Sequence, residues 1–297
     1  MTGVLARLER FGAVTSTSDV VRDWLADGVP EVCLAVADVQ VAGRGRNGRT
    51  WIAPVGTGLL ASVGLRPAWI PPDLAWRAAA TLSLAVAEAA EDVADLPPRT
   101  VGLKWPNDLV VEAGGVADGQ APGWTDPRRD PSGAIAFRKL GGVLAEATGL
   151  GSDDPHLVVG LGLNVDWEAR HFPAELAPAM TSLRALVGRP VARDDVLAAF
   201  LDRLEPRLDA LRGGRFAHDD WTARQVLPGA TVRLEGSGDA DGEWLVLAVD
   251  GASGALVVAE PAAPDGERRV PAGEAVHLRR ANGPEPDRLA LRAGGHV

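Results

Sequence analysis

Apolar residues recur along the chain with two different periods, and together these periods predict an α+β fold. Alternating or continuous apolar runs rich in β-branched residues predict strands. The expected strands span residues 31–41, 57–66, 100–111 (broken at Pro106), 139–148 and 156–165. Helical spacing of apolar residues predicts helices within residues 14–28, 73–94, 193–212 and 216–226. Thr17 or Ser18 is expected to cap the first helix, and Gly28 to end it.

The pattern changes near residues 227–229, where short strands begin to alternate with Gly/Asp turns. The expected strands here span residues 230–235, 243–250, 254–260, 267–271 and 275–280. Five short strands in about fifty residues predict a small β-barrel. We therefore divide the chain into a domain at residues 1–226, a barrel at 227–280 and a flexible tail at 281–297.

Residues 113–136 interrupt the first domain with a stretch rich in Gly, Asp and Pro. Such a composition can bury little apolar surface when the chain folds. We therefore predict that residues 113–136 form a mobile surface insertion.

The composition of the 297-residue chain is that of a globular protein, with 46% hydrophobic and 24% charged residues. Its formal net charge of −10 argues against a broadly basic nucleic-acid surface. The one cysteine, Cys33, excludes an internal disulfide framework and a Cys-based zinc site. The sequence has neither the apolar core of a signal peptide nor a run long enough for a membrane helix. We expect a soluble, cytoplasmic protein.

Lysine is nearly absent, because only Lys104 and Lys139 stand among the 30 basic residues. Where arginine serves as the general cation, the remaining lysines are candidates for roles that need a compact ammonium group. Neither lysine is followed by Ser or Thr, so the chain has no P-loop. The five histidines show no metal-binding spacing, and no GxSxG nucleophile motif occurs. Cys33 lies in an apolar run, where a reactive thiol is not expected.

Residues 43–51 read GRGRNGRTW and are the strongest candidate for anion binding. Their three glycines let backbone amides approach an anion closely. The guanidinium groups of Arg44, Arg46 and Arg49 match phosphate or carboxylate. The segment also fits the GxGxxG dinucleotide pattern, but the residues after the third glycine do not favour the helix that this pattern requires. An exposed basic turn is the other alternative.

Residues 104–108 read KWPND and form the second candidate. Pro106 breaks the strand and could aim Asn107 and Asp108 into a cleft. Lys104 suits a phosphate, and Asp108 could hold Mg²⁺ or orient a cation. The alternative is a strand end with a surface ion pair.

Two glycine-containing strands supply the remaining candidates. Residues 138–146 read RKLGGVLAE, and Lys139 at the mouth of an apolar slot could polarise a carboxylate or carbonyl. The alternative is a strand-edge lysine that discourages aggregation. Residues 160–165 read GLGLNV, where alternating glycines before Asn164 suggest close approach of a ligand. A core strand thinned by glycine explains that segment equally well.

Together these segments resemble the biotin protein ligases, or biotin–acetyl-CoA-carboxylase ligases. The family pattern is GRGRxGRxW, then KWPNDL, then K-L-x-G-I/V-L, then G-x-G-x-N. All four parts occur here in that order, at residues 43–51, 104–109, 139–144 and 160–164. Ser16, Thr17 and Gln40 also match, and the resemblance spans residues 11–280.

The resemblance implies a fold and a reaction. The fold would be the mixed-sheet α+β core shared with class II aminoacyl-tRNA synthetases, followed by an SH3-like β-barrel. The carboxylate of biotin would attack the α-phosphate of ATP to give biotinyl-5′-AMP and pyrophosphate. A lysine of a biotin carboxyl-carrier domain would then attack the mixed anhydride and release AMP. ATP and biotin are the implied substrates, with Mg²⁺ as a cofactor.

The resemblance also implies roles for individual residues. Lys139 would hold the biotin carboxylate beside the phosphate, with Arg46 and Arg44 as further catalytic cations. The implied biotin-binding residues are Ser16, Thr17, Gln40, Gly43, Arg44, Arg46, Lys139, Gly142, Leu144 and Gly160. The implied ATP-binding residues are Arg44, Arg46, Arg49, Trp51, Lys104, Asn107, Asp108 and Asn164, with Asp108 as a candidate metal ligand. Residues 43–51 would close over the adenylate and shield it from water.

Two departures from the family pattern bear on function. Members that double as repressors carry an N-terminal helix-turn-helix domain, and only residues 1–10 precede the matching region here, so no nucleic-acid partner is expected. The insertion at 113–136 separates KWPND from the Lys139 strand, where many members have a short turn. We expect a monomer or weak homodimer that acts on a biotin carboxyl-carrier domain without a membrane partner.

Two other functions remain open at this point. A lipoate or octanoate ligase shares the same core, but those families lack the GRGRxGRxW run. A non-catalytic biotin-binding protein would need no phosphate clamp, whereas this chain keeps both lysines and three arginines in the matching segments.

Overall fold

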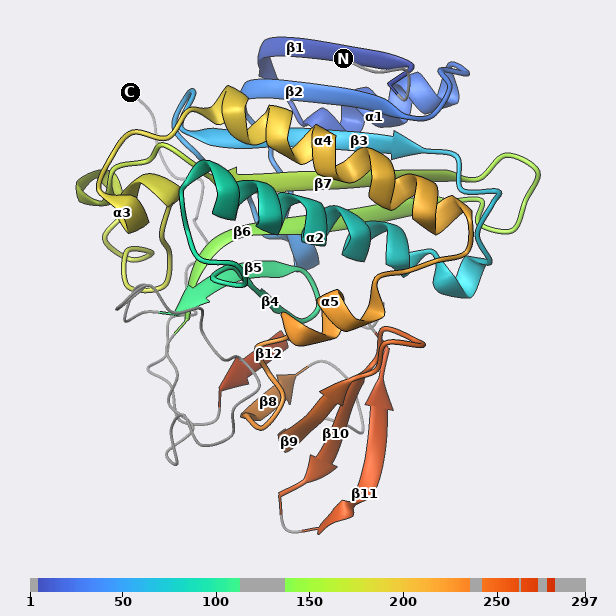
Figure 1. Cartoon of the computed structure of the whole chain (residues 1–297), viewed down its shortest axis with the longest axis vertical. Coiled ribbons are helices and arrows are strands. Elements are labelled where there is room, and N and C mark those ends of the chain that lie inside the picture. Colours follow the sequence, from blue (N-terminus) through green and yellow to red (C-terminus); the bar gives the residue numbers. More distant parts are fainter. Residues whose placement is uncertain (1–4, 113–136, 236–241, 262, 272–276, 281–297) are drawn as a thin grey trace.

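The computed structural model describes residues 5–112, 137–235, 242–261, 263–271 and 277–280. A seven-stranded mixed sheet with the order β1-β2-β3-β7-β6-β5-β4 forms its centre (Figure 1). The strands are β1 (Arg7–Val14), β2 (Cys33–Gln40), β3 (Gly58–Leu65), β4 (Gly102–Lys104), β5 (Asp108–Glu112), β6 (Phe137–Thr148) and β7 (His156–Asn164). β1 and β2 run parallel, and the other neighbours run antiparallel. The predicted insertion at 113–136 and tail at 281–297 lie outside the described residues.

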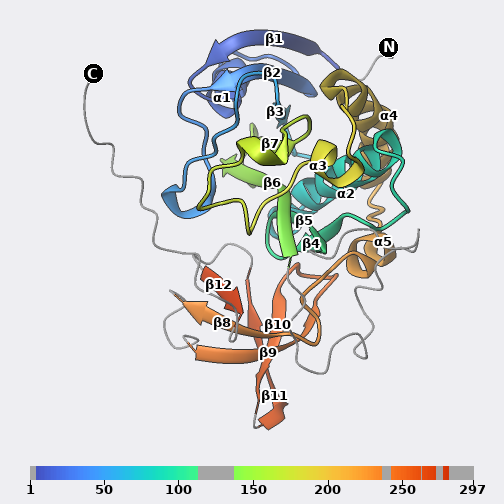
Figure 2. The ribbon, with the colours of Figure 1, turned by 90° about the vertical axis from the view of Figure 1, so that its left-hand side faces the viewer.

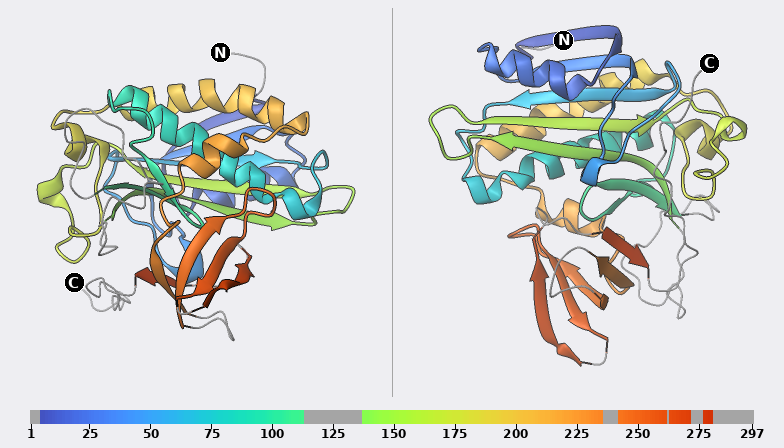
Figure 3. Two further views of the ribbon diagram at one scale, coloured as in Figure 1. Left: turned by 60° about the horizontal axis from the view of Figure 1, so that its bottom comes forward. Right: turned by 180° about the vertical axis from the view of Figure 1, so that it is seen from behind.

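Helices cover both faces of this sheet (Figure 2, Figure 3). α1 (Thr17–Ala26) packs on β2, β3 and β7 from one side. α2 (Trp76–Val93) and α4 (Arg193–Arg212) pack on each other and on the opposite side. The shorter elements are α3 (Leu183–Val187), α5 (His218–Ala223) and the 3₁₀ turns η1 (Arg46–Gly48), η2 (Pro72–Leu74) and η4 (Ala169–His171). β3 is buried along its whole length because helices cover both of its faces. None of the described helices is long and apolar enough to span a bilayer.

A second, antiparallel sheet with the order β11-β10-β9-β8-β12 lies below the β4–β5 edge of the first (Figure 1, Figure 2). Its strands are β8 (Thr231–Glu235), β9 (Gly242–Val249), β10 (Leu256–Glu260), β11 (Ala263–Val270) and β12 (His277–Arg280). This arrangement confirms the predicted fold class, an α+β mixed sheet followed by a small SH3-like β domain. The boundary at residue 227 stays a prediction, and Leu227 itself is buried in an apolar core that reaches into both sheets.

Three local expectations need correction. The cap of α1 is Ser16, whose hydroxyl accepts from the backbone N–H of Ser18, rather than Thr17 or Ser18. The strand expected at residues 100–111 is two antiparallel strands, β4 and β5, which reverse direction around Pro106. β1 was not predicted. It is an edge strand whose side chains are mostly exposed, so its apolar residues show no clear period.

A buried ion pair ties the segment between the two sheets to the first sheet. The guanidinium of Arg224 donates to both carboxylate oxygens of Glu91 at 2.6 and 2.9 Å, and only 5% and 4% of these side chains are exposed. Glu91 also accepts from the backbone N–H of Val101 at 2.8 Å. Next to this pair, Leu103 of β4 exchanges backbone hydrogen bonds with residues 224 and 226. The pair therefore fixes the strand that leads into residues 104–108.

We predict that Arg224→Met lowers the free energy of unfolding by about 3–5 kcal/mol, because the Glu91 carboxylate would stay buried without its partner. The double variant Glu91→Leu/Arg224→Met should recover most of this loss, since it removes both buried charges together. Urea denaturation followed by circular dichroism measures both values. If Arg224→Met were as stable as the wild type, water would have to solvate the Glu91 carboxylate in that variant.

Candidate functional site

A cavity of about 240 Å³ lies on the α1 side of the sheet, where the segments selected from the sequence come together. It is bounded by the start of α1, the segment at 43–51, the β4–β5 turn and the middle of β6 and β7. Of the predicted site residues, those that line it are Ser16, Thr17, Gln40, Arg44, Arg46, Arg49, Trp51, Lys104, Asn107, Asp108, Lys139, Gly142, Leu144 and Gly160. Gly43 and Asn164 do not line it.

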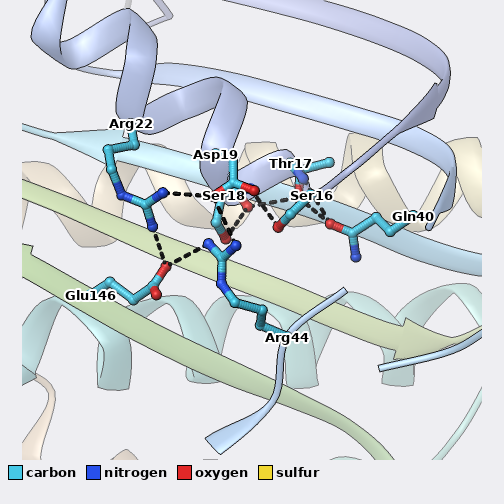
Figure 4. Close-up of polar contacts among 9 residues, drawn as sticks. Ser16, Thr17, Ser18, Asp19, Arg22, Gln40, Arg44 and Glu146 are labelled. Atoms are coloured by element: carbon cyan, nitrogen blue, oxygen red, sulfur yellow. Dashed lines mark hydrogen bonds and ion pairs between the residues drawn. The ribbon is translucent and has the colours of Figure 1, made fainter. Parts of the chain in front are cut away.

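One end of the cavity is a cluster of buried hydroxyl groups (Figure 4). The Thr17 hydroxyl lies 2.7 Å from the Ser62 hydroxyl, which in turn lies 3.0 Å from the Ser18 hydroxyl. The Gln40 side-chain oxygen accepts from the backbone N–H of Thr17 at 2.7 Å and from its hydroxyl at 3.0 Å. Hydroxyl groups both donate and accept hydrogen bonds, so this end suits a compact polar group with both kinds of partner.

Glycines leave room for the cavity floor. A Cβ at Gly160 would lie 2.9 Å from the Ser18 hydroxyl oxygen, so a larger residue there would intrude on the hydroxyl cluster. A Cβ at Gly162 would lie 2.6 Å from Cε2 of Trp51, because the indole lies directly on this backbone. Nε1 of Trp51 is buried and has no hydrogen-bond partner among the described residues. The indole therefore closes one side of the cavity and leaves a buried donor unused.

Residues 43–51 form a small β-hairpin, which we call the Gly/Arg hairpin. Backbone hydrogen bonds join Gly45 N–H to the Arg49 carbonyl at 2.7 Å and Trp51 N–H to the Gly43 carbonyl at 2.9 Å. Its tip has positive φ at both Asn47 (56°) and Gly48 (71°), as a type I′ turn requires. The Asn-Gly pair is a strong hairpin signal, so the turn could have been predicted from the sequence. This geometry also excludes the dinucleotide-fold interpretation, which needs a helix here.

Lys139, on β6, lines the same cavity. Its Nζ lies 2.7 Å from Oδ1 of Asp108 and 5.4 Å from the centre of the Trp51 ring. The neighbouring Gly142 is paired with Asp108 across the β5–β6 ladder, and a Cβ there would lie 3.5 Å from Oδ1. A cation, a carboxylate and an aromatic ring thus lie close together beside Gly142, which has no side chain to separate them.

The β4–β5 turn is held from two sides. The backbone carbonyl of Asn107 accepts from the backbone N–H of Val143 on β6 at 2.9 Å, which fixes the turn against the cavity floor. Trp105 is 3% exposed, and its Nε1 donates to the carbonyl of Gly254 in the β9–β10 turn at 2.9 Å. The second sheet therefore supports the turn that carries Lys104, Asn107 and Asp108.

The arginines of the hairpin have different surroundings. The Arg44 guanidinium donates to Asp19 at 2.8 Å and to Glu146 at 3.2 Å (Figure 4). The electrostatic surroundings of Arg46 differ. Burial lowers the pKa of its guanidinium group, and the charge of Arg49 lowers it further, while Asp108 raises it in part. A lowered arginine pKa marks a place where positive charge is costly, and a bound anion would relieve that cost.

Two predicted residues lie apart from the cavity lining. Asn164 is buried and donates from Nδ2 to the Thr181 carbonyl at 2.9 Å, so its side chain is used to hold the segment after β7. A Cβ at Gly43 would lie 2.5 Å from the Trp51 carbonyl oxygen, which shows that this glycine permits the close pairing within the hairpin. Ser18 and Ser62 were not predicted as site residues, because isolated serines carry no spacing signal until the strands are aligned.

The residues present fit a magnesium ion only in a limited way. Among the described residues, no group of three or more His, Cys, Asp or Glu side chains could hold a metal ion. Asp108 is the one carboxylate that lines the cavity in the described part of the chain. Mg²⁺ is often held by one or two carboxylates together with substrate phosphates and water. Asp108 therefore fits as one ligand of an ion that arrives with a phosphate-bearing substrate.

Comparisons with known proteins agree on one family. The model of the biotin/lipoate A/B protein ligase family matches residues 11–164. The biotin–[acetyl-CoA-carboxylase] ligase of Mycobacterium tuberculosis is 31% identical over 261 residues, which cover 85% of this chain and 80% of that protein. The enzyme of the same name from Paracoccus denitrificans is 29% identical over a match that covers 84% of this chain and 92% of that protein. The structure of biotin protein ligase from Aquifex aeolicus in complex with biotin and ATP has a TM-score of 0.70 at 26% identity, covering 93% of this chain and 99% of that one.

We predict that Gly162→Ala displaces Trp51 and lowers the free energy of unfolding by about 1–3 kcal/mol, because the added methyl group would overlap the indole. Gly12→Ala on β1 is the control, since no atom lies within 4 Å of the Cβ that it would add. Urea denaturation and the near-ultraviolet circular dichroism of the tryptophans report the change. Equal stability of the two variants would show that Trp51 does not pack on this strand.

Proposed function

This chain belongs to the biotin/lipoate A/B protein ligase family, and we propose that it is an ATP-dependent biotin protein ligase. The observation that carries this proposal is the pairing of two opposite environments in one cavity. A buried hydroxyl cluster and the cations Lys139, Arg46 and Arg49 line the same cavity. A ligand with a neutral polar head and a carboxylate tail, bound beside a separate triphosphate, matches these two environments.

Biotin would bind with its ureido ring at the hydroxyl cluster. Ser16, Thr17 and Gln40 offer donors and acceptors inside an otherwise enclosed slot, and Ser18 and Ser62 extend this set. The floor at Gly142, Leu144 and Gly160 leaves space for the apolar part of the ligand. The carboxylate would then reach Lys139, which would exchange its contact with Asp108 for the ligand.

The first chemical step joins biotin to AMP. A biotin carboxylate oxygen attacks the α-phosphorus of ATP, the new O–P bond forms, and the bond to pyrophosphate breaks. Negative charge on the transferred adenylyl group would be stabilised by Lys139 and Arg46, which both line the cavity. In the second step, a carrier lysine amine attacks the acyl carbon, loses a proton and releases AMP.

The triphosphate would lie between the Gly/Arg hairpin and the β4–β5 turn. Arg46, Arg49 and Lys104 supply positive charge there, and Asn107 and Trp51 line the same region. Mg²⁺ would neutralise charge on the departing pyrophosphate, with Asp108 as its protein ligand. A role for Asn164 in supporting the nucleotide would have to act through the segment at Thr181 that it holds.

A lipoate or octanoate ligase is the second candidate, because the family description covers both kinds of enzyme. Its ligand would place an apolar dithiolane or alkyl end against Thr17, Ser18 and Ser62, and would leave their hydroxyl groups without ligand partners. The ureido group of biotin can use the donor and acceptor positions that the hydrogen bonds within the cluster leave over, whereas an apolar end cannot, so the hydroxyl cluster favours biotin. A non-catalytic biotin-binding protein would gain nothing from Arg46 and Arg49, which would face a phosphate group.

The partner would be the biotin carboxyl-carrier domain of a biotin-dependent carboxylase in the cytoplasm. The carrier lysine must reach the acyl carbon, so the mouth of the cavity has to accept an extended loop of a folded domain. We propose that the protein does this as a monomer or weak homodimer.

We predict that Lys139→Ala reduces biotin transfer to a purified carrier domain by about 10²-fold or more, because it removes a preorganised cation from the reacting phosphate. Arg138→Ala is the matched control, since Arg138 is the preceding residue of β6 and its side chain is exposed. Biotin-dependent exchange of radiolabelled pyrophosphate into ATP follows the first step alone. Wild-type protein that exchanges only with lipoate or octanoate would move the proposal to the second candidate, and exchange with none would favour a binding protein.

We predict that Arg46→Gly speeds the release of biotinyl-5′-AMP, because it removes a cation that holds the phosphate under the hairpin. Arg46→Lys should release it more slowly than the glycine variant, since a positive charge remains. Rapid gel filtration of enzyme loaded with labelled biotin measures the release rate. Equal release by wild type and Arg46→Gly would refute the retaining role of Arg46.

A further inference from the structure

Four charged side chains beside the cavity form a closed set of ion pairs, which we call the anchor cluster: Asp19, Arg22, Arg44 and Glu146 (Figure 4). Arg44 reaches Asp19 at 2.8 Å and Glu146 at 3.2 Å. Arg22 reaches the same two carboxylates at 2.6 and 2.9 Å. Two positive and two negative groups therefore balance each other, and each arginine bridges both carboxylates.

Only one member of the anchor cluster lies on the Gly/Arg hairpin. Asp19 and Arg22 stand on α1, and Glu146 stands on β6, both of which are long, packed elements of the main sheet layer. Arg44 of the hairpin forms ion pairs with both of these elements, with Asp19 on α1 and with Glu146 on β6. The exposed fractions of the four side chains lie between 33% and 43%, so water screens the cluster only in part.

The electrostatics of Arg44 differ from those of Arg46. Burial would lower the pKa of the Arg44 guanidinium, but its hydrogen bonds to Asp19 and Glu146 outweigh burial and raise it. Burial likewise would raise the pKa of the Asp19 carboxyl, but Arg22 and Arg44 lower it. The Arg44 charge is thus already compensated, whereas Arg46 sits where positive charge is disfavoured. A guanidinium whose fork is occupied by two carboxylates is a poor phosphate ligand.

We propose that Asp19 and Glu146, braced by Arg22, are positioning residues that hold the Gly/Arg hairpin over the cavity through Arg44. In this assignment Arg44 does not bind phosphate, and the hairpin covers the reactive intermediate because this cluster keeps it in place. The consequence for the reaction rests on the proposed function, but the anchoring itself does not.

The placement of the anchor residues couples the hairpin to the walls of the cavity. Along β6, Gly142 and Leu144 line the cavity, and Glu146 follows on the same face two residues later. At the start of α1, Ser16 to Ser18 line the hydroxyl end, and Asp19 comes next. The two elements that would contact biotin, β6 and the start of α1, therefore each carry a carboxylate that forms an ion pair with Arg44 of the hairpin.

The anchoring is tested first by trypsin on the ligand-free protein, because trypsin cleaves after arginine and the hairpin contains Arg46 and Arg49. Asp19→Asn and Glu146→Gln keep the shape of the side chain and remove its charge. We expect cleavage inside the hairpin, identified by mass spectrometry, to rise by about tenfold in each variant as the open form becomes more populated. Glu9→Gln, which breaks only an exposed pair with Arg7, is the control and should match the wild type.

Thermal unfolding of the same variants separates anchoring from general stability. An unchanged melting temperature with faster hairpin cleavage supports the proposal. Unchanged cleavage, or cleavage that rises at sites throughout the chain together with a lower melting temperature, overturns it. These readouts need no substrate, so they decide the anchoring even if the protein is not a biotin ligase.

The consequence for the reaction is tested with biotin and ATP. Glu146→Gln and Arg44→Gln should each release biotinyl-5′-AMP about tenfold faster than wild type, with the KM for ATP unchanged, and the double variant should be no faster than either. A raised KM for ATP in Arg44→Gln alone would overturn the assignment and restore a phosphate role for Arg44. If wild type forms no biotinyl-5′-AMP, the proposed function fails, while the trypsin result still stands.

Discussion

The register of three neighbouring strands is the constraint on which the cavity depends. Pairing across β3, β7 and β6 places Ser62, Gly160 and Leu144 in one row, and Gly162, Gly142 and Asp108 in the next row toward β5. Two rows on one face thus supply a hydroxyl, glycine gaps and a carboxylate. A shift of one residue in β7 would turn both glycines to the other face, so the contacts that Trp51 and Ser18 make with this strand would be lost.

The role of Gly160 and Gly162 can be assigned only once the strands are aligned. In the sequence, alternating glycines in an apolar strand fit a thinned core as well as a ligand site. In the sheet, Gly162 lies under Trp51 and Gly160 lies under Ser18, with no space for a Cβ at either position. The same two residues therefore serve packing and leave room for a ligand, and the two interpretations are not exclusive.

Much of the fold and of the cavity lining could be predicted from the sequence. The apolar residues of the main strands and helices follow clear periods, and most of the lining residues lie in four short motifs. The strands β2, β3, β6 and β7 and the helices α2 and α4 lie where their apolar spacing placed them. The unpredicted parts depend on distant partners. Exposed β1 is a strand because β2 offers it an edge, and Ser62 belongs to the site because β3 lies beside β7. Likewise, nothing near Arg44 in the sequence indicates that Asp19 and Glu146 surround it.

The hydrogen bond from Trp105 to Gly254 has a consequence for biosynthesis. The turn that carries Lys104 and Asp108 is synthesised early, yet one of its supports comes from a β-turn about 150 residues later. While the chain is still on the ribosome, the main sheet can assemble before that support exists. The cavity would reach its final shape only after the second sheet has left the exit tunnel and folded, so a nascent chain would not load its ligands before the body of the protein is complete.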